Sequence, residues 1–220
     1  MVDIHTHIIP FVDDGAKSIE QSIDMIKHEI SIGVKRIYCT PHHIYQKYES
    51  PIEEIKQQFE LLKSKVQEEN LDVELLLGQE IYYTTRENII KKLDEHKLLT
   101  MNGTKYILLE FSFVDEPDDI YELVYNFECH GYKVIIAHVE RYDWMTIDKV
   151  IGLRQEGAII QVNAGSVVDE TTRKEFKFVK KLFKKNLVDI IASDTHHFRP
   201  SSLDKAIKKS GLEFNDDFIK

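Results

Sequence analysis

The 220-residue chain contains little of several residue types that mark common classes of protein. It has two cysteines, Cys39 and Cys129, which are too few for a disulfide framework. Neither is followed by an arginine six residues later, so the C-x5-R loop of cysteine-dependent phosphatases is absent. Both cysteines are therefore expected to be small buried hydrophobic residues.

Long apolar runs are also missing, and this excludes other classes. No run approaches the length of a membrane helix, and Asp3 and His5 interrupt the N-terminus at once. We therefore expect no membrane insertion and a cytoplasmic location. The net charge of −9 argues against wide binding to nucleic acid. The first predicted strand is not followed by G-x-G-x-x-G or G-x-x-x-x-G-K, the usual nucleotide loops.

The chain instead alternates short apolar runs with longer segments of helical periodicity. Capping boxes at Ser18/Gln21 and Ser50/Glu53 begin two of the predicted helices. Strands are expected at Val2–Ile4, Val34–Thr40, Val73–Leu77, Tyr106–Phe111, Val134–Ala137, Ala158–Val162 and Val188–Ala192. Helices are expected at Ser18–Ile32, 52–66, Arg86–His96, Pro117–Cys129, Ile147–Glu156, Thr171–Lys185 and Ser202–Ser210.

About seven β-then-α units in a row predict an α/β fold with a parallel sheet. That number of units favours a closed barrel over an open doubly wound sheet. No Ser/Gly/Pro linker divides the chain, so residues 1–220 are expected to form a single domain.

Polar side chains follow nearly every predicted strand. They are His5, His7, His42, His43, Glu80, Glu110, His138, Asn163, Asp194 and His196. The C-terminal ends of parallel barrel strands lie on one face, so these side chains are expected to meet there. Imidazoles and carboxylates without a thiolate suit manganese, iron or zinc. Two arginines, Arg141 and Arg199, stand close in sequence to these residues, and guanidinium groups match phosphate oxygens.

A set of motifs in this order resembles a known family. They are H-T-H, V-D-D-G, T-P-H-H, G-Q-E, L-L-E-F-S, H-V-E-R-Y, Q-V-N-A-G-S and S-D-T-H. The chain is similar to the PHP (polymerase and histidinol phosphatase) superfamily, and within it to bacterial metal-dependent protein-tyrosine phosphatases of capsule and exopolysaccharide systems.

The resemblance implies a distorted (β/α)7 TIM-like barrel with the active site at the C-terminal ends of its strands. It implies three divalent ions, with manganese favoured and iron or zinc as alternatives. The implied substrate is phosphotyrosine in a protein, on the tail of a bacterial tyrosine autokinase, attacked by a metal-bridging hydroxide. The alternatives are a small-molecule phosphomonoesterase of the histidinol-phosphatase type and a non-catalytic PHP module.

The same resemblance implies roles for individual residues. His5, His7, Glu80 and Asp194 would hold the first ion, Glu80, Glu110 and His138 the second, and Asp14, His42 and His196 the third. Arg141 and Arg199 would bind the substrate phosphate. Val139 departs from the family, which usually has proline there, and the spacing from His196 to Arg199 is shorter than in some relatives.

Several assignments stay open in the sequence. Asp13 is an alternative to Asp14 as a ligand, because adjacent carboxylates cannot be told apart by spacing. His43 and His197 adjoin predicted ligands, and each would either orient a ligand or lie at the rim. Tyr45, Tyr48, Tyr82 and Tyr83 are candidates for the lining of an aromatic substrate pocket.

Overall fold

The computed structural model describes residues 1–212 and 214–219, and it forms two parallel sheets. The smaller sheet has the order β1-β2-β4, with β1 at Val2–Thr6, β2 at Arg36–Cys39 and β4 at Glu74–Leu77. The larger sheet has the order β3-β5-β6-β7-β8-β9. Its strands are β3 (His42–His43), β5 (Glu80–Tyr82), β6 (Tyr106–Glu110), β7 (Lys133–Ile136), β8 (Ile159–Asn163) and β9 (Ile190–Ala192).

The two sheets form one closed wall. β3 follows β2 after two residues and β5 follows β4 after two residues, and hydrogen bonds cross between these neighbours. The Gly78 amide donates to the Cys39 carbonyl at 2.9 Å, and the Glu80 amide donates to the Pro41 carbonyl at 3.1 Å. β1 meets the end of β9, where the Asp194 amide donates to the His5 carbonyl at 2.9 Å. The wall is therefore a distorted barrel of seven strand positions, which confirms the predicted fold.

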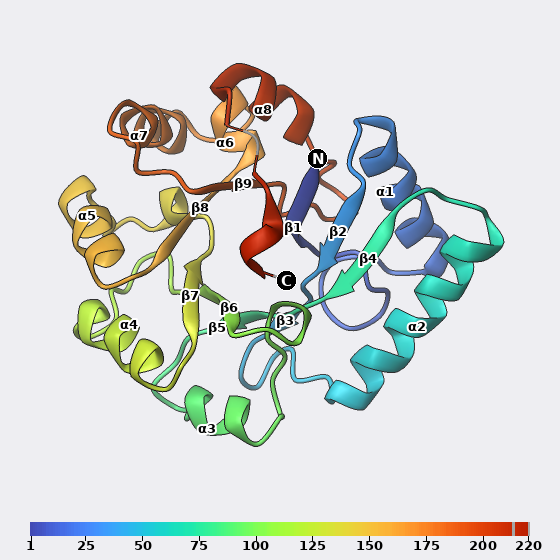
Figure 1. Cartoon of the computed structure of the whole chain (residues 1–220), viewed down its shortest axis with the longest axis horizontal. Helices are drawn as coiled ribbons and strands as arrows, with labels where there is room; N and C mark the ends of the chain where they lie inside the picture. The colour runs from blue at the N-terminus through green and yellow to red at the C-terminus, as the bar shows by residue number, and fades with distance from the viewer. Residues whose placement is uncertain (213, 220) are drawn as a thin grey trace.

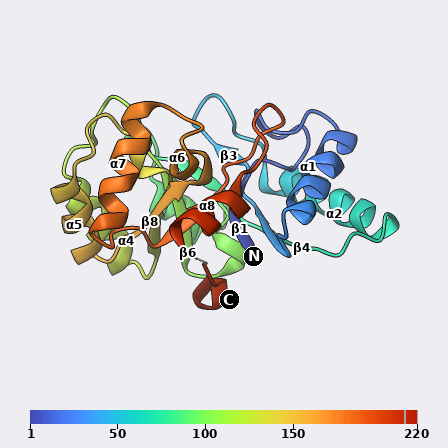
Figure 2. The ribbon, with the colours of Figure 1, turned by 90° about the horizontal axis from the view of Figure 1, so that it is seen from above.

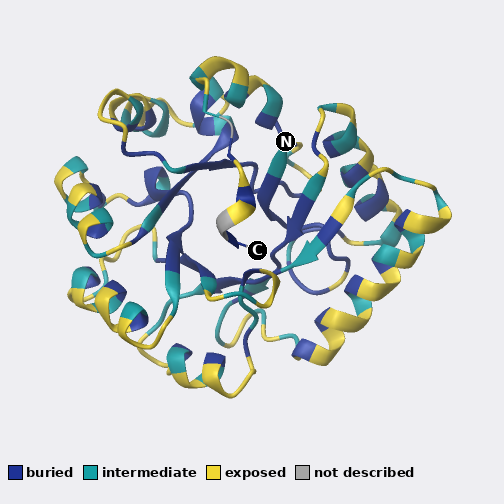
Figure 3. Ribbon diagram, viewed as in Figure 1, coloured by how far each residue is buried: buried dark blue, intermediate teal, exposed yellow. Residues whose placement is uncertain are grey.

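Helices surround this wall (Figure 1). They are α1 (Ile19–Ser31), α2 (Ile52–Glu68), α3 (Ile89–Asp94), α4 (Ile120–Cys129), α5 (Ile147–Gln155), α6 (Ala164–Val168), α7 (Arg173–Lys184) and α8 (Leu203–Ser210). Short 3-10 helices are η1 (Met101–Gly103), η2 (Val139–Arg141) and η3 (Asp216–Ile219). The strands are largely buried, whereas exposed residues gather on the outer faces of the helices (Figure 3). Among the described residues, no helix is long and apolar enough to cross a membrane. The cytoplasmic location stays a prediction.

Two apolar cores fill the molecule. The larger one lies between the strands and the helices, where Ile37, Leu109 and Ile136 face outward from the wall. The smaller one includes Ile4, Leu108 and residues of η3 such as Ile219. η3 lies at the end of the barrel where β1 begins (Figure 2), so one end of the barrel is closed by apolar packing.

The local predictions were confirmed in part. The Ser18 side chain accepts a hydrogen bond from the Gln21 amide and caps α1 as predicted. The Ser50/Glu53 capping box was wrong, because Pro51 is the N-cap of α2 and makes no side-chain cap. The Ser50 hydroxyl donates to the Val12 carbonyl instead. The burial prediction held for Cys39 and was wrong for Cys129, which is exposed at the end of α4.

Candidate metal centre

The polar side chains predicted to meet do so at the C-terminal ends of the strands. The strands themselves position several of them: His5 lies in β1, His42 in β3, Glu80 in β5 and Glu110 in β6. The others, which follow a strand or lie in the loop after β1, are His7, Asp14, His138, Asp194 and His196. A cavity of about 490 Å³ opens onto the cluster, and Asp14, His42, Glu110, Asp194 and His196 line it.

Glu80 lies at the centre of this arrangement and is fully buried. Its Oε2 lies 3.2 Å from Nε2 of His5 and 3.2 Å from Nε2 of His7. The same oxygen lies 2.9 Å from Nδ1 of His42, and Oε1 lies 3.0 Å from Nε2 of His138. One carboxylate therefore contacts four imidazoles that come from three strand ends.

The two histidines of H-T-H converge, as their spacing predicts. Their Nε2 atoms lie 3.3 Å apart. Both also face Asp194, whose Oδ1 lies 3.7 Å from the His5 nitrogen and 3.5 Å from the His7 nitrogen. The strand pairing of β1 is irregular between Asp3 and Thr6, so this convergence occurs at a locally distorted strand.

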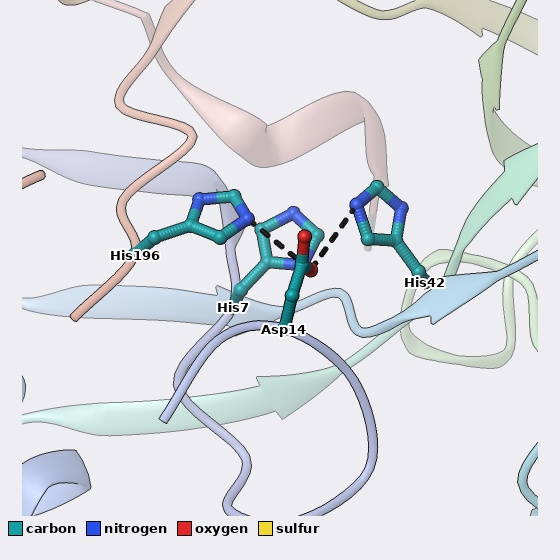
Figure 4. Close-up of side chains that lie close together, drawn as sticks. All are labelled: His7, Asp14, His42 and His196. Carbon is teal, nitrogen blue, oxygen red and sulfur yellow. Dashed lines mark ion pairs between the residues drawn. The ribbon is translucent and has the colours of Figure 1, made fainter. Parts of the chain in front are cut away.

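Asp14 forms a second group with three histidines (Figure 4). Its carboxylate lies between His196 and His42, and its Oδ1 is 3.6 Å from Nε2 of each ring. The His7 and His196 rings stack with centroids 4.1 Å apart. Ligand atoms of His7, Asp14, His42 and His196 all lie within 4.8 Å of one another, so this group could hold a metal ion.

Asp13 has a different environment from its neighbour Asp14. Its Oδ2 lies 2.7 Å from Nδ1 of His7 and accepts a hydrogen bond from the His42 amide at 2.9 Å. Its Oδ1 accepts from the Gly15 amide at 2.8 Å. Asp13 thus fixes the ring of His7 and the backbone of His42, while Asp14 faces the cluster. Gly15 is required here, since a Cβ atom on it would lie 2.0 Å from the His7 carbonyl oxygen.

Gln161 and Asn163 connect three of the strand ends, and Gln161 was not predicted as a site residue. The Gln161 Oε1 accepts from the His138 amide at 2.8 Å and lies 3.3 Å from Nδ1 of His5. Its Nε2 donates to Asn163, whose Nδ2 donates to Oδ2 of Asp194 at 2.9 Å. A signal was present in the sequence, because a glutamine inside an apolar strand needs buried partners.

The charges of the cluster shift the ionisation of its members. Burial and then the nearby Arg141 lower the pKa of His138 to about 4, which keeps this imidazole neutral as metal binding requires. Burial and the Glu80 charge raise the pKa of Glu110 to about 9. Although burial opposes ionisation, the charges of His5 and Arg199 hold the pKa of Asp194 well below its usual range. The site therefore combines crowded carboxylates with neutral and cationic neighbours.

Backbone strain accompanies two of these positions. His138 has φ 30° and Asp194 has φ 52°, which is the left-handed region that residues with a side chain rarely adopt. Such conformations cluster at functional sites, where surrounding contacts maintain them. In this protein the strained residues turn the chain at the ends of β7 and β9 and direct their side chains into the cluster.

The two arginines predicted to bind phosphate lie beside each other at the cavity. Nη1 of Arg141 lies 3.2 Å from Oδ2 of Asp194, and Nη2 of Arg199 lies 2.7 Å from the same oxygen. Both line the cavity and both are part-buried. Two guanidinium groups that share one carboxylate oxygen would also attract the anionic oxygens of a bound phosphate.

The neighbouring histidines lie outside these groups. Nε2 of His43 is 3.0 Å from Oε2 of Glu87. Nδ1 of His197 is 2.7 Å from the carbonyl oxygen of Gly15, so His197 supports the loop that carries Asp14. Of the four tyrosines considered as a pocket lining, Tyr82 lines the cavity and Tyr48 stacks on His42 with centroids 6.0 Å apart. Tyr45, Tyr82 and Tyr83 line an adjacent cavity of about 430 Å³.

Comparison with known proteins agrees with this geometry. A tyrosine-protein phosphatase, CpsB of Streptococcus pneumoniae, is 33% identical over 215 residues, which cover 94% of this chain and 88% of that protein. A solved structure from work on YwqE of Bacillus subtilis and CpsB of S. pneumoniae, described as metal-dependent tyrosine phosphatases, superposes with a TM-score of 0.90. It is 31% identical and covers 99% of this chain and 89% of the other.

A more distant structure shares the fold alone. It is histidinol phosphate phosphatase from Lactococcus lactis, with a TM-score of 0.63 and 13% identity over 97% of this chain and 95% of the other. The family model for capsular polysaccharide synthesis, CpsB/CapC, matches residues 1–218. The chain therefore belongs to the CpsB/CapC family of capsular polysaccharide synthesis proteins.

Proposed function

We propose that this chain is a metal-dependent protein-tyrosine phosphatase, a phosphoric monoester hydrolase acting on phosphotyrosine in a protein. The observation that carries the proposal is the Glu80 carboxylate in contact with four histidines, with Arg141 and Arg199 at the cavity that opens onto this cluster. The family relatives named as tyrosine phosphatases support the reaction.

The residues present fit divalent cations. The buried polar atoms that make no hydrogen bond among the described residues include Oε2 of Glu80, Nδ1 of His42 and Oδ1 of Asp14, although the first two lie 2.9 Å apart. A cation would be their natural partner, because an unpaired buried polar group is costly. The donors are imidazole nitrogens and carboxylate oxygens, a set that suits manganese, iron or zinc.

The distances support three ions, of which manganese is our first choice. His5, His7, Glu80 and Asp194 would hold one ion, and Glu80, Glu110 and His138 a second. Asp14, His42 and His196 would hold the third, as one of the compact groups. Glu80 would contribute to two of these ions, since its two oxygens face different histidines.

The chain's own groups would then act on the substrate. Divalent ions in such a site make water a nucleophile at neutral pH and offset the charge of the phosphoryl oxygens. Arg141 and Arg199 would bind the remaining phosphoryl oxygens and orient the phosphorus toward the cluster. Asp13 and Gln161 would hold His7, His5 and His138 in place, so that the ligands need no rearrangement during turnover.

The surroundings of the cavity favour a protein substrate. The adjacent cavity shares Ile44, Tyr82, Phe111 and Ser112 with the cavity at the cluster. Residues that flank a phosphotyrosine would therefore find a surface continuous with the site. We propose a bacterial tyrosine kinase tail as the physiological substrate, in keeping with the capsule-synthesis family.

The decisive experiment compares substrates under controlled metal content. A phosphotyrosine peptide and histidinol phosphate are assayed with manganese, after chelation, and after manganese is restored. We expect manganese-dependent hydrolysis of the peptide at a much higher kcat/KM than histidinol phosphate. A preference for histidinol phosphate would assign the small-molecule activity. Metal binding measured without hydrolysis of either substrate would assign a non-catalytic module.

A further inference from the structure

Two exposed phenyl rings lie at the cavity and have no role in the assignments above. Phe113 is in the loop after β6 and is 36% exposed, and Phe198 is in the loop after β9 and is 65% exposed. Both line the same cavity as Arg141 and Arg199. Aromatic side chains that line a concave site beside charged groups are typical of ligand pockets, where they offer apolar contact area.

Each ring lies against a residue of the candidate centre. The Phe113 ring centroid is 4.3 Å from the guanidinium carbon of Arg141, and it is 6.0 Å from the His138 ring. The centroid of the Phe198 ring is 5.2 Å from that of the His196 ring. In the chain, Phe198 directly precedes Arg199. A phosphate held by the two arginines would therefore have one phenyl ring packed on Arg141 and a second ring lining the same cavity.

We propose that Phe113 and Phe198 form a subsite for the aromatic ring of the substrate, which selects aryl phosphates over alkyl phosphates. The inference rests on the proposed function for the identity of the phosphate ester. When the phosphate of an ester is bound at Arg141 and Arg199, the organic part of the ester would extend between side chains of the loops after β6 and β9. Aromatic rings attract one another in stacked or edge-to-face arrangements, whereas a short alkyl group offers little surface to either ring.

The subsite also explains how an open site could choose its substrate. Several metal ligands line the cavity directly, so a short phosphoserine side chain could reach them as well as phosphotyrosine. The depth of the cavity would then discriminate little between phosphotyrosine and phosphoserine. Contacts to the ring supply a difference in binding between the two esters, which is what specificity requires.

The test measures binding as well as turnover. Phenylphosphonate and methylphosphonate, which are not hydrolysed, are titrated calorimetrically into the manganese-loaded wild type and into Phe113→Ala, Phe198→Ala and the double variant. We expect each single change to weaken phenylphosphonate about tenfold, as loss of one aromatic contact and its buried area implies, and to leave methylphosphonate unchanged. Phe198→Tyr should restore the wild-type ratio, because it keeps the ring.

A matched control is Phe11→Ala, which removes a ring that is 61% exposed on a loop of the same face and does not line the cavity. Its binding ratio should equal that of the wild type. Equal binding of the two phosphonates by the wild type would overturn the subsite even if phosphotyrosine is hydrolysed. Equal weakening of both by Phe113→Ala would also overturn it, since Phe113 would then only position Arg141. Ring-dependent binding without phosphotyrosine hydrolysis would overturn the proposed function and leave the subsite intact.

Discussion

The two ends of the barrel are built by the same strands and have opposite character. Along β6, Leu108 belongs to the inner apolar core and Glu110, two residues later, belongs to the candidate metal centre. Along β9, Ile190 and Ala192 belong to the core and Asp194 follows in the cluster. Residues two apart share one side of a strand, so the inward-facing side of each strand carries apolar side chains first and candidate metal ligands at its C-terminal end.

The buried carboxylate of η3, at the end opposite the cluster, is paired, whereas several buried atoms of the cluster make no hydrogen bond. At η3, the Asp216 carboxylate accepts from the Tyr38 hydroxyl at 2.9 Å and from Nη1 of Arg36 at 2.6 Å. At the cluster, Glu80, Asp14 and His42 retain buried atoms that make no hydrogen bond within the described chain. We therefore expect Asp216 to contribute to stability and the open end to hold the reacting groups, as in barrel enzymes generally.

The largest effect is expected at the centre of the open end. Glu80→Ala should lower turnover of phosphotyrosine by about a thousandfold or more, since two ions held by Glu80 would contribute several kcal/mol to stabilising the transition state. Bound metal, measured by elemental analysis, should fall as well. The matched control is Glu74→Ala, an exposed carboxylate on the preceding strand that pairs with Arg36. A variant at Glu80 with normal rate and full metal content would exclude the bridging role.

The next effect separates phosphate binding from metal binding. Arg141→Ala should retain its metals and lose about a hundredfold or more in rate, because two hydrogen bonds to charged oxygens are worth about 3–6 kcal/mol together. Arg141→Lys should recover little, since an ammonium group cannot form the planar fork. Arg154→Ala serves as the control, because Arg154 binds Asp189 away from the cavity. Loss of metal in Arg141→Ala would make its role structural.

The closed end should respond in the opposite way. Asp216→Ala leaves the buried Tyr38 hydroxyl without its acceptor and removes the partner of Arg36. The free energy of unfolding, measured by urea denaturation, should fall by about 1–3 kcal/mol. The kcat of the folded variant should stay at the wild-type value. A large fall in kcat or in metal content would show that the two ends are coupled.

The smallest effect is expected for the thiols. Burial raises the pKa of Cys39 to about 12, so its thiol should resist iodoacetamide in the folded protein. Cys129 is exposed and should be modified, with activity retained because it lies at the end of α4 away from the cluster. Mass spectrometry identifies the modified residue and an assay gives the rate. Inactivation that follows alkylation of either cysteine would refute a thiol-independent mechanism.

Much of the architecture could be read from periodicity. Most strands form where short apolar runs predict them, and most helices form where apolar residues recur with the 3.6-residue helical period. Burial of apolar side chains dominates the choice of local structure. Three short elements were missed: β3, β5 and α6 contain two, three and five residues, whereas the equally short β9 was predicted within its longer apolar run. Segments of that length carry no measurable period, and their conformation depends on neighbouring strands.

The sequence by itself determined which residue types lie at the strand ends, because a polar residue that ends an apolar run marks the edge of the buried segment. Only the tertiary structure distinguishes the surroundings of Asp13, which faces His7, from those of Asp14, which faces His42 and His196, since adjacent carboxylates have the same chemistry and differ only in the direction of their side chains. It likewise decided that Gln161 connects His5 to His138 and that Phe113 lies over Arg141. These contacts join residues far apart in the chain, and closing the barrel is what brings them together.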